Sequence, residues 1–248
     1  MIKRLDWRIG MALALVAASA ITYFIHYLIF RDVHHIFIYM VGDIAFLFIS
    51  VLVVTLFIER VLAQREKRIL INKLNMVIGT FFSEVGLNLM QQFSVFVSNA
   101  GELSRKLEIR PAWTAKDFQA AAEEARRFPY KIQIDVDAMV ALQAFLAEKR
   151  TFLVRLLENP NLLEHERFTD LLWAVFHLAE ELSFRGDKIK NLPAADYEHL
   201  GGDLKRAYSQ IASEWMAYAR HLKQCYPFLF SLAARINPFR PNPTAIIG

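Results

Sequence analysis

Two long apolar runs, residues 9–30 and 36–58, lie near the start of the chain and are separated by only five residues. Each run exceeds 20 residues, which is about what an α-helix needs to cross the roughly 30 Å apolar core of a bilayer. The short link leaves room only for an antiparallel hairpin. The pattern therefore predicts two membrane-spanning helices, and Asp43 is the single carboxylate within them.

The helical pattern continues beyond the second run. No helix-breaking residue occurs between Ile58 and Gly79, so the second helix is expected to extend into a charged stalk. Residues 77–97 then carry apolar side chains at a spacing of 3.6 residues, at positions 78, 81, 82, 85, 89, 93 and 96. This stripe predicts an amphipathic helix that packs on neighbouring helices or lies on the membrane surface.

The rest of the chain has the pattern of helices joined by short breaks, without a strand pattern of useful length. Thr114 and Asp117 have capping-box spacing and predict a helix through Arg127. A long last helix is expected over 194–234, with an irregularity at 201–202. We predict an all-α protein in which a transmembrane helical hairpin continues into a stalk and a cytoplasmic helical bundle. The predicted divisions are the hairpin at 1–60, the stalk and amphipathic helix at 61–110, the bundle at 111–236 and a Pro-rich tail at 237–248.

Charge is concentrated beside the predicted spans. The chain has 248 residues and a formal net charge of +4, and residues 60–73 hold five cations against the single carboxylate Glu66. Positive charge also precedes the first span, whereas the link is neutral, so both termini are expected in the cytoplasm. The lone cysteine, Cys225, excludes an internal disulfide. Contact with anionic lipid headgroups, and not with nucleic acid, is predicted for Arg60, Arg65, Lys67, Arg68 and Lys73.

Five short runs carry a resemblance to known proteins: Arg65-Glu-Lys-Arg, Lys73-Leu-Asn-Met-Val-Ile-Gly, Phe82-Ser-Glu-Val-Gly, Leu157-Glu-Asn-Pro-Asn-Leu-Leu-Glu-His-Glu and Tyr226-Pro-Phe-Leu-Phe-Ser-Leu. Together they resemble an uncharacterised family of bacterial two-span membrane proteins with a C-terminal cytoplasmic helical domain. The resemblance covers the second span and nearly all of the cytoplasmic part. It implies a bacterial inner-membrane location and brings no catalytic or binding residues.

Asp43 is the most informative candidate residue, because an ionisable group inside a membrane span is costly to bury. His26 lies a few residues before the link and Asp43 a few residues after it, so both are expected within about 12 Å of the outer surface. One interpretation is a pH-sensitive contact between the two, or a structural hydrogen bond from Asp43 to a neighbouring helix. The other is a ring of Asp43 carboxylates at the mouth of a proton or cation pathway.

Four side chains of the late helices are weaker candidates for a metal site. His177 and Glu181 are one helical turn apart, whereas Glu214 and His221 are two turns apart on the last helix. Two such helices side by side would offer two imidazoles and two carboxylates to a metal ion. The Glu-x-x-His pairs of di-iron bundles are absent, so polar contacts within the bundle are the alternative interpretation.

No Gly-rich phosphate loop, nucleophile elbow, paired-cysteine site or His-Glu-x-x-His motif occurs in the sequence, so we expect no enzyme and predict no cofactor. Two spans are too few to enclose a pathway, so transport would need several copies. The first hypothesis is a homo-oligomeric inner-membrane protein with a channel-like assembly and Asp43 near its outer mouth. The alternative is a membrane-anchored interaction or signalling module whose cytoplasmic domain binds a protein partner.

Overall fold

The computed structural model describes residues 7–246, except for the side chains of residues 7–9, 68, 72, 163 and 164. All the regular secondary structure of this range is helical, apart from an isolated bridge between Val97 and Ile132, which confirms the all-α prediction. The chain divides into two compact units, Met1–Lys67 and Arg68–Gly248. We call them the N-terminal hairpin and the C-terminal domain.

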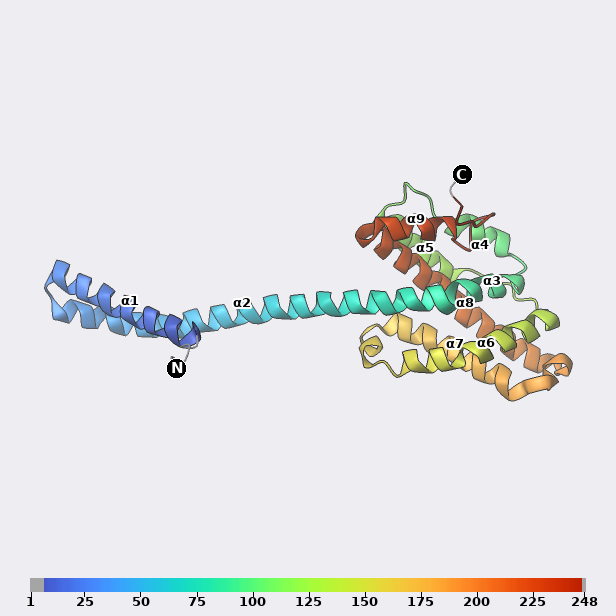
Figure 1. Cartoon of the computed structure of the whole chain (residues 1–248), viewed down its shortest axis with the longest axis horizontal. Helices are drawn as coiled ribbons and strands as arrows, with labels where there is room; N and C mark the ends of the chain where they lie inside the picture. Colours follow the sequence, from blue (N-terminus) through green and yellow to red (C-terminus); the bar gives the residue numbers. More distant parts are fainter. Residues whose placement is uncertain (1–6, 247–248) are drawn as a thin grey trace, which may run out of the picture. The chain divides into compact units, whose positions relative to one another are not determined.

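The N-terminal hairpin consists of α1 (Trp7–Phe30) and the first part of α2 (Val33–Phe81), which lie side by side (Figure 1). Arg31 turns the chain with a φ of 48°, and the Asp32 carboxylate accepts hydrogen bonds from the backbone N–H groups that open α2. Both helices are long and apolar enough to cross a membrane, and their apolar stretches are not buried within the structure. The second helix starts at Val33, earlier than the apolar run suggests, because Asp32 caps it.

Helix α2 continues without a break through the charged stretch to Phe81, as the sequence predicts. A π-helical turn, η1 (Phe82–Gly86), follows it and leads into α3 (Leu87–Val95). A Cβ atom on Gly86 would lie 2.6 Å from the Phe82 ring, so glycine leaves space for this ring. All seven positions of the predicted amphipathic stripe are buried in the C-terminal domain. The stripe therefore packs on protein, which resolves the choice between core and membrane surface in favour of core.

The C-terminal domain is built around α8 (Ala194–Cys225), which packs against α5 (Ala115–Arg127), α7 (Glu166–Arg185) and α9 (Pro227–Arg235) (Figure 1). The predicted capping box of Thr114 and Asp117 opens α5, and Asp135 caps α6. Edge-on and stacked aromatic contacts join η1 to α8 through Phe82, Trp215 and Tyr218. The remaining elements are α4 (Ala100–Leu107), α6 (Val136–Leu157), η2 (Pro160–Glu164) and η3 (Gly186–Asn191).

The predicted single helix over 194–234 is wrong in two respects. The helix passes through Gly201 without irregularity, and a Cβ added there would make ordinary van der Waals contact with Ile132 Cγ2 at 3.4 Å. It breaks instead at Tyr226, because Pro227 lacks an N–H group and its ring would clash with the preceding turn. Pro227 is well suited to the first turn of the new helix, α9.

The chain after α9 folds back onto its own domain. Asn237 is fully buried; its Oδ1 accepts a hydrogen bond from Trp215 Nε1 at 3.0 Å, and its Nδ2 donates to the Leu107 carbonyl at 3.2 Å. Phe239 is buried two residues later. One amide side chain therefore connects the C-terminal segment with α4 and α8.

We expect Asn237→Ala to lower the free energy of unfolding by about 2–3 kcal/mol, because it leaves a buried indole N–H and a buried carbonyl without partners. Urea unfolding of the purified full-length chain measures this difference. The matched control is Asn242→Ala in the exposed part of the same segment, which should stay within about 0.5 kcal/mol of the unaltered protein. Equal effects of the two substitutions would contradict the assigned role of Asn237.

Candidate functional site

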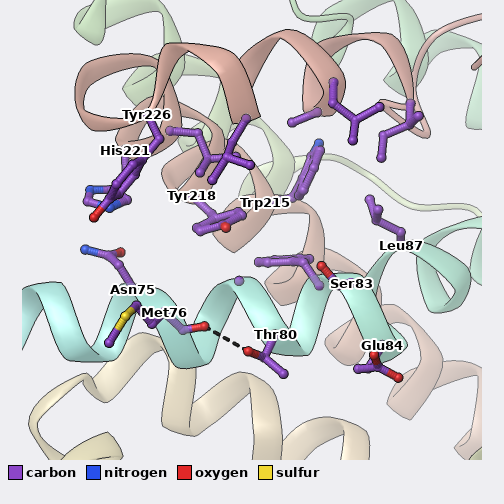
Figure 2. Close-up of a pocket in the computed structure, with 17 residues that line it drawn as sticks. Asn75, Met76, Thr80, Ser83, Glu84, Leu87, Trp215, Tyr218, His221 and Tyr226 are labelled. Carbon is purple, nitrogen blue, oxygen red and sulfur yellow. Dashed lines mark hydrogen bonds between the residues drawn. The ribbon is translucent and has the colours of Figure 1, made fainter. Parts of the chain in front are cut away.

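A groove of about 590 Å³ opens in the C-terminal domain, between the end of α2 with η1 on one side and α8 with α9 on the other (Figure 2). Its walls are mainly apolar and aromatic, with a few polar groups among them. Concave apolar surfaces of this kind are where proteins most often bind ligands or partner segments. The walls include Met76, Phe82, Trp215, Tyr218, Leu229 and Leu232.

Gly79 on α2 and Tyr218 on α8 both line the groove and lie in close contact. Gly79 faces Tyr218, and a Cβ atom at this position would lie 2.4 Å from the Tyr218 hydroxyl oxygen. The Tyr218 ring stacks on Phe82, with ring centroids 5.5 Å apart and planes 18° apart. Glycine at position 79 thus allows the tyrosine ring to lie flat against the floor of the groove.

Apart from the Glu84 carboxylate, the polar groups that line the groove are uncharged at neutral pH. Burial, with a contribution from Arg220, lowers the pKa of His221 below its ordinary value. Burial also raises the pKa of Tyr218. In Figure 2, Asn75 on α2 lies opposite His221 on α8. The groove therefore combines apolar walls with neutral hydrogen-bonding groups, and it suits an apolar surface with a few polar atoms.

Asp43 and His26 line one hollow of about 450 Å³ on the N-terminal hairpin. Asp43 is exposed, and the described residues record no hydrogen bond between it and His26. His26 Nδ1 is enclosed and has no hydrogen-bond partner among the described residues, while its ring lies 4.7 Å from that of Phe30 and 6.2 Å from that of His35. The other residues of the hollow are Ser19, Thr22, Tyr23, Ile36 and Tyr39.

The basic residues predicted to contact lipid lie along α2. The side chains of Arg60, Arg65, Lys67 and Lys73 are exposed, as lipid contact would require. The side chain of Arg68 lies outside the described residues, as do Lys3 and Arg4 ahead of the first helix.

The structure separates the four predicted metal ligands into two groups. Glu214 is buried, and this burial raises its pKa, while His221 lines the groove. His177 and Glu181 instead lie beside two residues from the start of α8, His199 and Asp203.

The second pair of this cluster has a sequence signal that could have revealed it. His199 and Asp203 are one helical turn apart, the same spacing as His177 and Glu181. The short element η3 joins α7 to α8, so the end of one helix faces the start of the next. The two His/carboxylate pairs come together because α7 packs against α8 in this way. The sequence pattern does not reveal this packing.

The carboxylates of this cluster also contact arginines. Arg185 donates to Glu181 and, at 2.9 Å, to Asp196. The hydrogen bond from Arg185 lowers the pKa of Glu181, so this carboxylate is ionised at neutral pH. Arg206 Nη1 donates to Asp203 Oδ1 at 2.9 Å. In each of the carboxylates of Glu181 and Asp203, one oxygen is therefore held by an arginine.

The fold and these sites define a class of all-α protein, with an apolar N-terminal helical hairpin and a larger C-terminal helical domain. The chain belongs to the family described as "Uncharacterized protein MJ1433, C-terminal helical domain", which matches residues 70–235. Residues 2–62 match "MJ1433, N-terminal helical domain".

A relative described as "Uncharacterized protein MJ1433", from Methanocaldococcus jannaschii, is 41% identical over 236 residues, which cover 95% of this chain and 94% of the relative. No solved structure matches the chain significantly. These matches confirm the resemblance to an uncharacterised family with a C-terminal helical domain. They assign no role to any residue, and the bacterial membrane location stays a prediction.

Because the pKa of His221 is lowered in the folded state, we expect it to titrate below 6.5. Acidification then protonates this residue first in the unfolded chain, so its contribution lowers stability as the pH falls below 6.5. NMR titration of ¹³C-labelled histidines, assigned with His221→Gln, measures the pKa. Arg220→Gln should raise it in part, since burial is the larger cause, whereas the control Arg240→Gln should leave it unchanged. An unshifted titration of His221 would contradict its placement in the groove wall.

Proposed function

We propose that this chain is an integral membrane protein that is anchored by the N-terminal hairpin and assembles with identical copies around a polar pathway containing Asp43 and His26. The observation that carries this proposal is the polar stripe, which we define as the side chains of Ser19, Thr22, Tyr23 and His26 on α1 and of Tyr39 and Asp43 on α2. All six line the same hollow and lie within the two apolar runs.

The spacing of the polar stripe puts it on one face of each helix. On α1 its members lie at positions i, i+3, i+4 and i+7, and on α2 they lie at i and i+4, so each set shares a helix face. The Thr22 hydroxyl donates to the Ala18 carbonyl, which satisfies that group locally. Asp43 and the imidazole of His26 have no such local partner among the described residues.

A polar stripe on a membrane hairpin is expected to contact protein or water, because ionisable groups in a bilayer core do not face lipid. The second apolar run begins at residue 36, seven residues before Asp43, so Asp43 would lie about 10 Å inside the outer boundary of the bilayer core. Two helices cannot surround a pathway, whereas several copies with their polar stripes turned to a shared axis can do so.

The charge distribution supports an orientation with both termini in the cytoplasm. The exposed cations of α2 follow the second apolar run, where they would meet the anionic lipids of the inner leaflet. In this arrangement Asp43 belongs to the outer half of the pathway. A bacterial inner membrane, which the resemblance implies, is the location we propose.

We expect Asp43→Asn to lower cation flux through the reconstituted protein to near that of protein-free vesicles, because it removes the charge from the pathway. Flux is measured in liposomes with imposed proton or potassium gradients. The matched control is Ser50→Ala, because Ser50 lies on the same helix, donates to the Phe46 carbonyl and does not line the hollow. Absence of flux in the unaltered protein, or equal flux in both variants, would contradict a pathway at Asp43.

A second function is favoured by the groove of the C-terminal domain, which we propose binds an amphipathic helix of a protein partner. Met76, Leu229 and Leu232 line the groove yet are 64%, 43% and 40% exposed. A groove with such exposed walls would enclose a small ligand poorly, whereas an amphipathic helix can contact all three side chains. Phe228, the residue before Leu229, is 73% exposed. The anchor would then hold this docking groove at the membrane.

A photoreactive amino acid at position 232 should form a crosslink to one partner protein in intact membranes. The crosslinked residue of that partner should lie on the apolar face of a helix. Position 173 provides the control, because Trp173 is 56% exposed but lies on α7 away from the groove. Leu232→Asp, tested with the photoreactive group at position 229, should abolish the crosslink. Crosslinks to lipid or to a second copy of the chain would contradict a partner helix.

A further inference from the structure

The cluster at the junction of α7 and α8 holds four potential metal ligands. His177 and Glu181 come from the C-terminal half of α7, and His199 and Asp203 come from the N-terminal half of α8. One ligand atom each from His177, His199 and Asp203 lie within 4.8 Å of one another. Glu181 adjoins this group, with its Oε1 3.9 Å from His177 Nε2 and its Oε2 3.6 Å from His199 Nε2.

The carboxylate of Asp203 is the least expected member of the cluster. Its side chain is only 3% exposed, and Oδ2 has no hydrogen-bond partner among the described residues. Buried carboxylate oxygens normally have partners, because an ionised oxygen without one is costly in apolar surroundings. Arg206 occupies Oδ1, which leaves Oδ2 free and aimed between the two imidazoles.

The distances in the cluster suit a shared ion better than direct hydrogen bonds. Asp203 Oδ2 lies 3.5 Å from His177 Nε2 and 3.4 Å from His199 Nε2. Hydrogen bonds from nitrogen to oxygen are about 2.7–3.2 Å long. Neighbouring ligand atoms of a tetrahedral metal ion with bonds of about 2.0–2.1 Å lie about 3.3–3.4 Å apart. The two contacts of Oδ2 are close to the second spacing.

We propose that His177, His199 and Asp203, with Glu181 as the fourth ligand, bind a divalent transition metal ion of the zinc class. Two imidazoles and one or two carboxylates form a ligand set that such ions favour. The imidazoles are about half exposed, at 46% and 54%, so an ion can enter from solvent, while Asp203 closes the inner side. The ion would fasten the end of α7 to the start of α8.

The arginines around the cluster act as outer partners in this arrangement. Arg206 orients Asp203 through Oδ1, and Arg185 orients Glu181 while it also holds Asp196. Outer-shell hydrogen bonds of this kind fix the direction in which a ligand oxygen points. The alternative is a cluster that binds no metal ion and is held together by its contacts with the two arginines, in which case zinc would not change the stability of the protein.

The tag-free, full-length protein is equilibrated with zinc chloride and dialysed, and its zinc content is measured by elemental analysis. Competition with a chromophoric chelator measures the affinity for zinc. We expect one zinc ion per chain and a higher unfolding temperature with zinc present. His199→Gln should weaken zinc binding more than about 100-fold, since loss of a ligand costs more than loss of an outer-shell partner. It should also remove the thermal shift, and Asp203→Asn should do the same.

Two control variants keep the outcome interpretable. His221→Gln alters a histidine of the groove, and the pair His34→Gln with His35→Gln alters those beside the link; both should bind zinc like the unaltered protein. His177→Gln replaces Asp203→Asn if the latter fails to fold, because His177 is half exposed. Failure to bind zinc, or binding that persists in both His199→Gln and His177→Gln, would overturn the proposal.

Discussion

A polar atom in apolar surroundings needs a partner, and this constraint connects the separate features of the chain. Asn237 meets it inside one domain, where its amide joins Trp215 to the Leu107 carbonyl. Asp203 Oδ2 and His26 Nδ1 do not meet it within the described residues. In the C-terminal domain we propose a metal ion as the missing partner, and in the N-terminal hairpin we propose another copy of the chain.

The C-terminal domain depends on the burial of the stretch that follows the charged part of α2. Phe81 packs edge-on against Phe168 of α7, and Phe82 contacts Trp215 and Tyr218 of α8. The π-helical turn of η1 falls within this aromatic contact. Through Phe81 and Phe82 this aromatic contact joins the end of α2 and η1 to both α7 and α8, and Phe82 with Trp215 and Tyr218 also lines the groove.

The sequence predicted those features that local periodicity determines. The stripe from Ile78 to Phe96 was complete, because burial on one side of a helix leaves a repeat of 3.6 residues. The capping box at Thr114 was likewise local. The partners of His177 were missed because they depend on how α7 pairs with α8, which no local pattern encodes. Ser19 and Thr22 were not predicted as site residues, because two small hydroxyls interrupt an apolar run only slightly. Their place in the hollow depends on how α1 packs against α2.

The most direct test of the central claim is whether the polar stripe of one chain faces that of another. In a Cys225→Ser background, Thr22→Cys places a thiol on the polar stripe, and Ala20→Cys places one on another face of α1. Oxidation in native membranes should link chains through position 22 and not through position 20. A monomer at position 22, or equal linkage at both positions, would contradict assembly around Asp43 and His26.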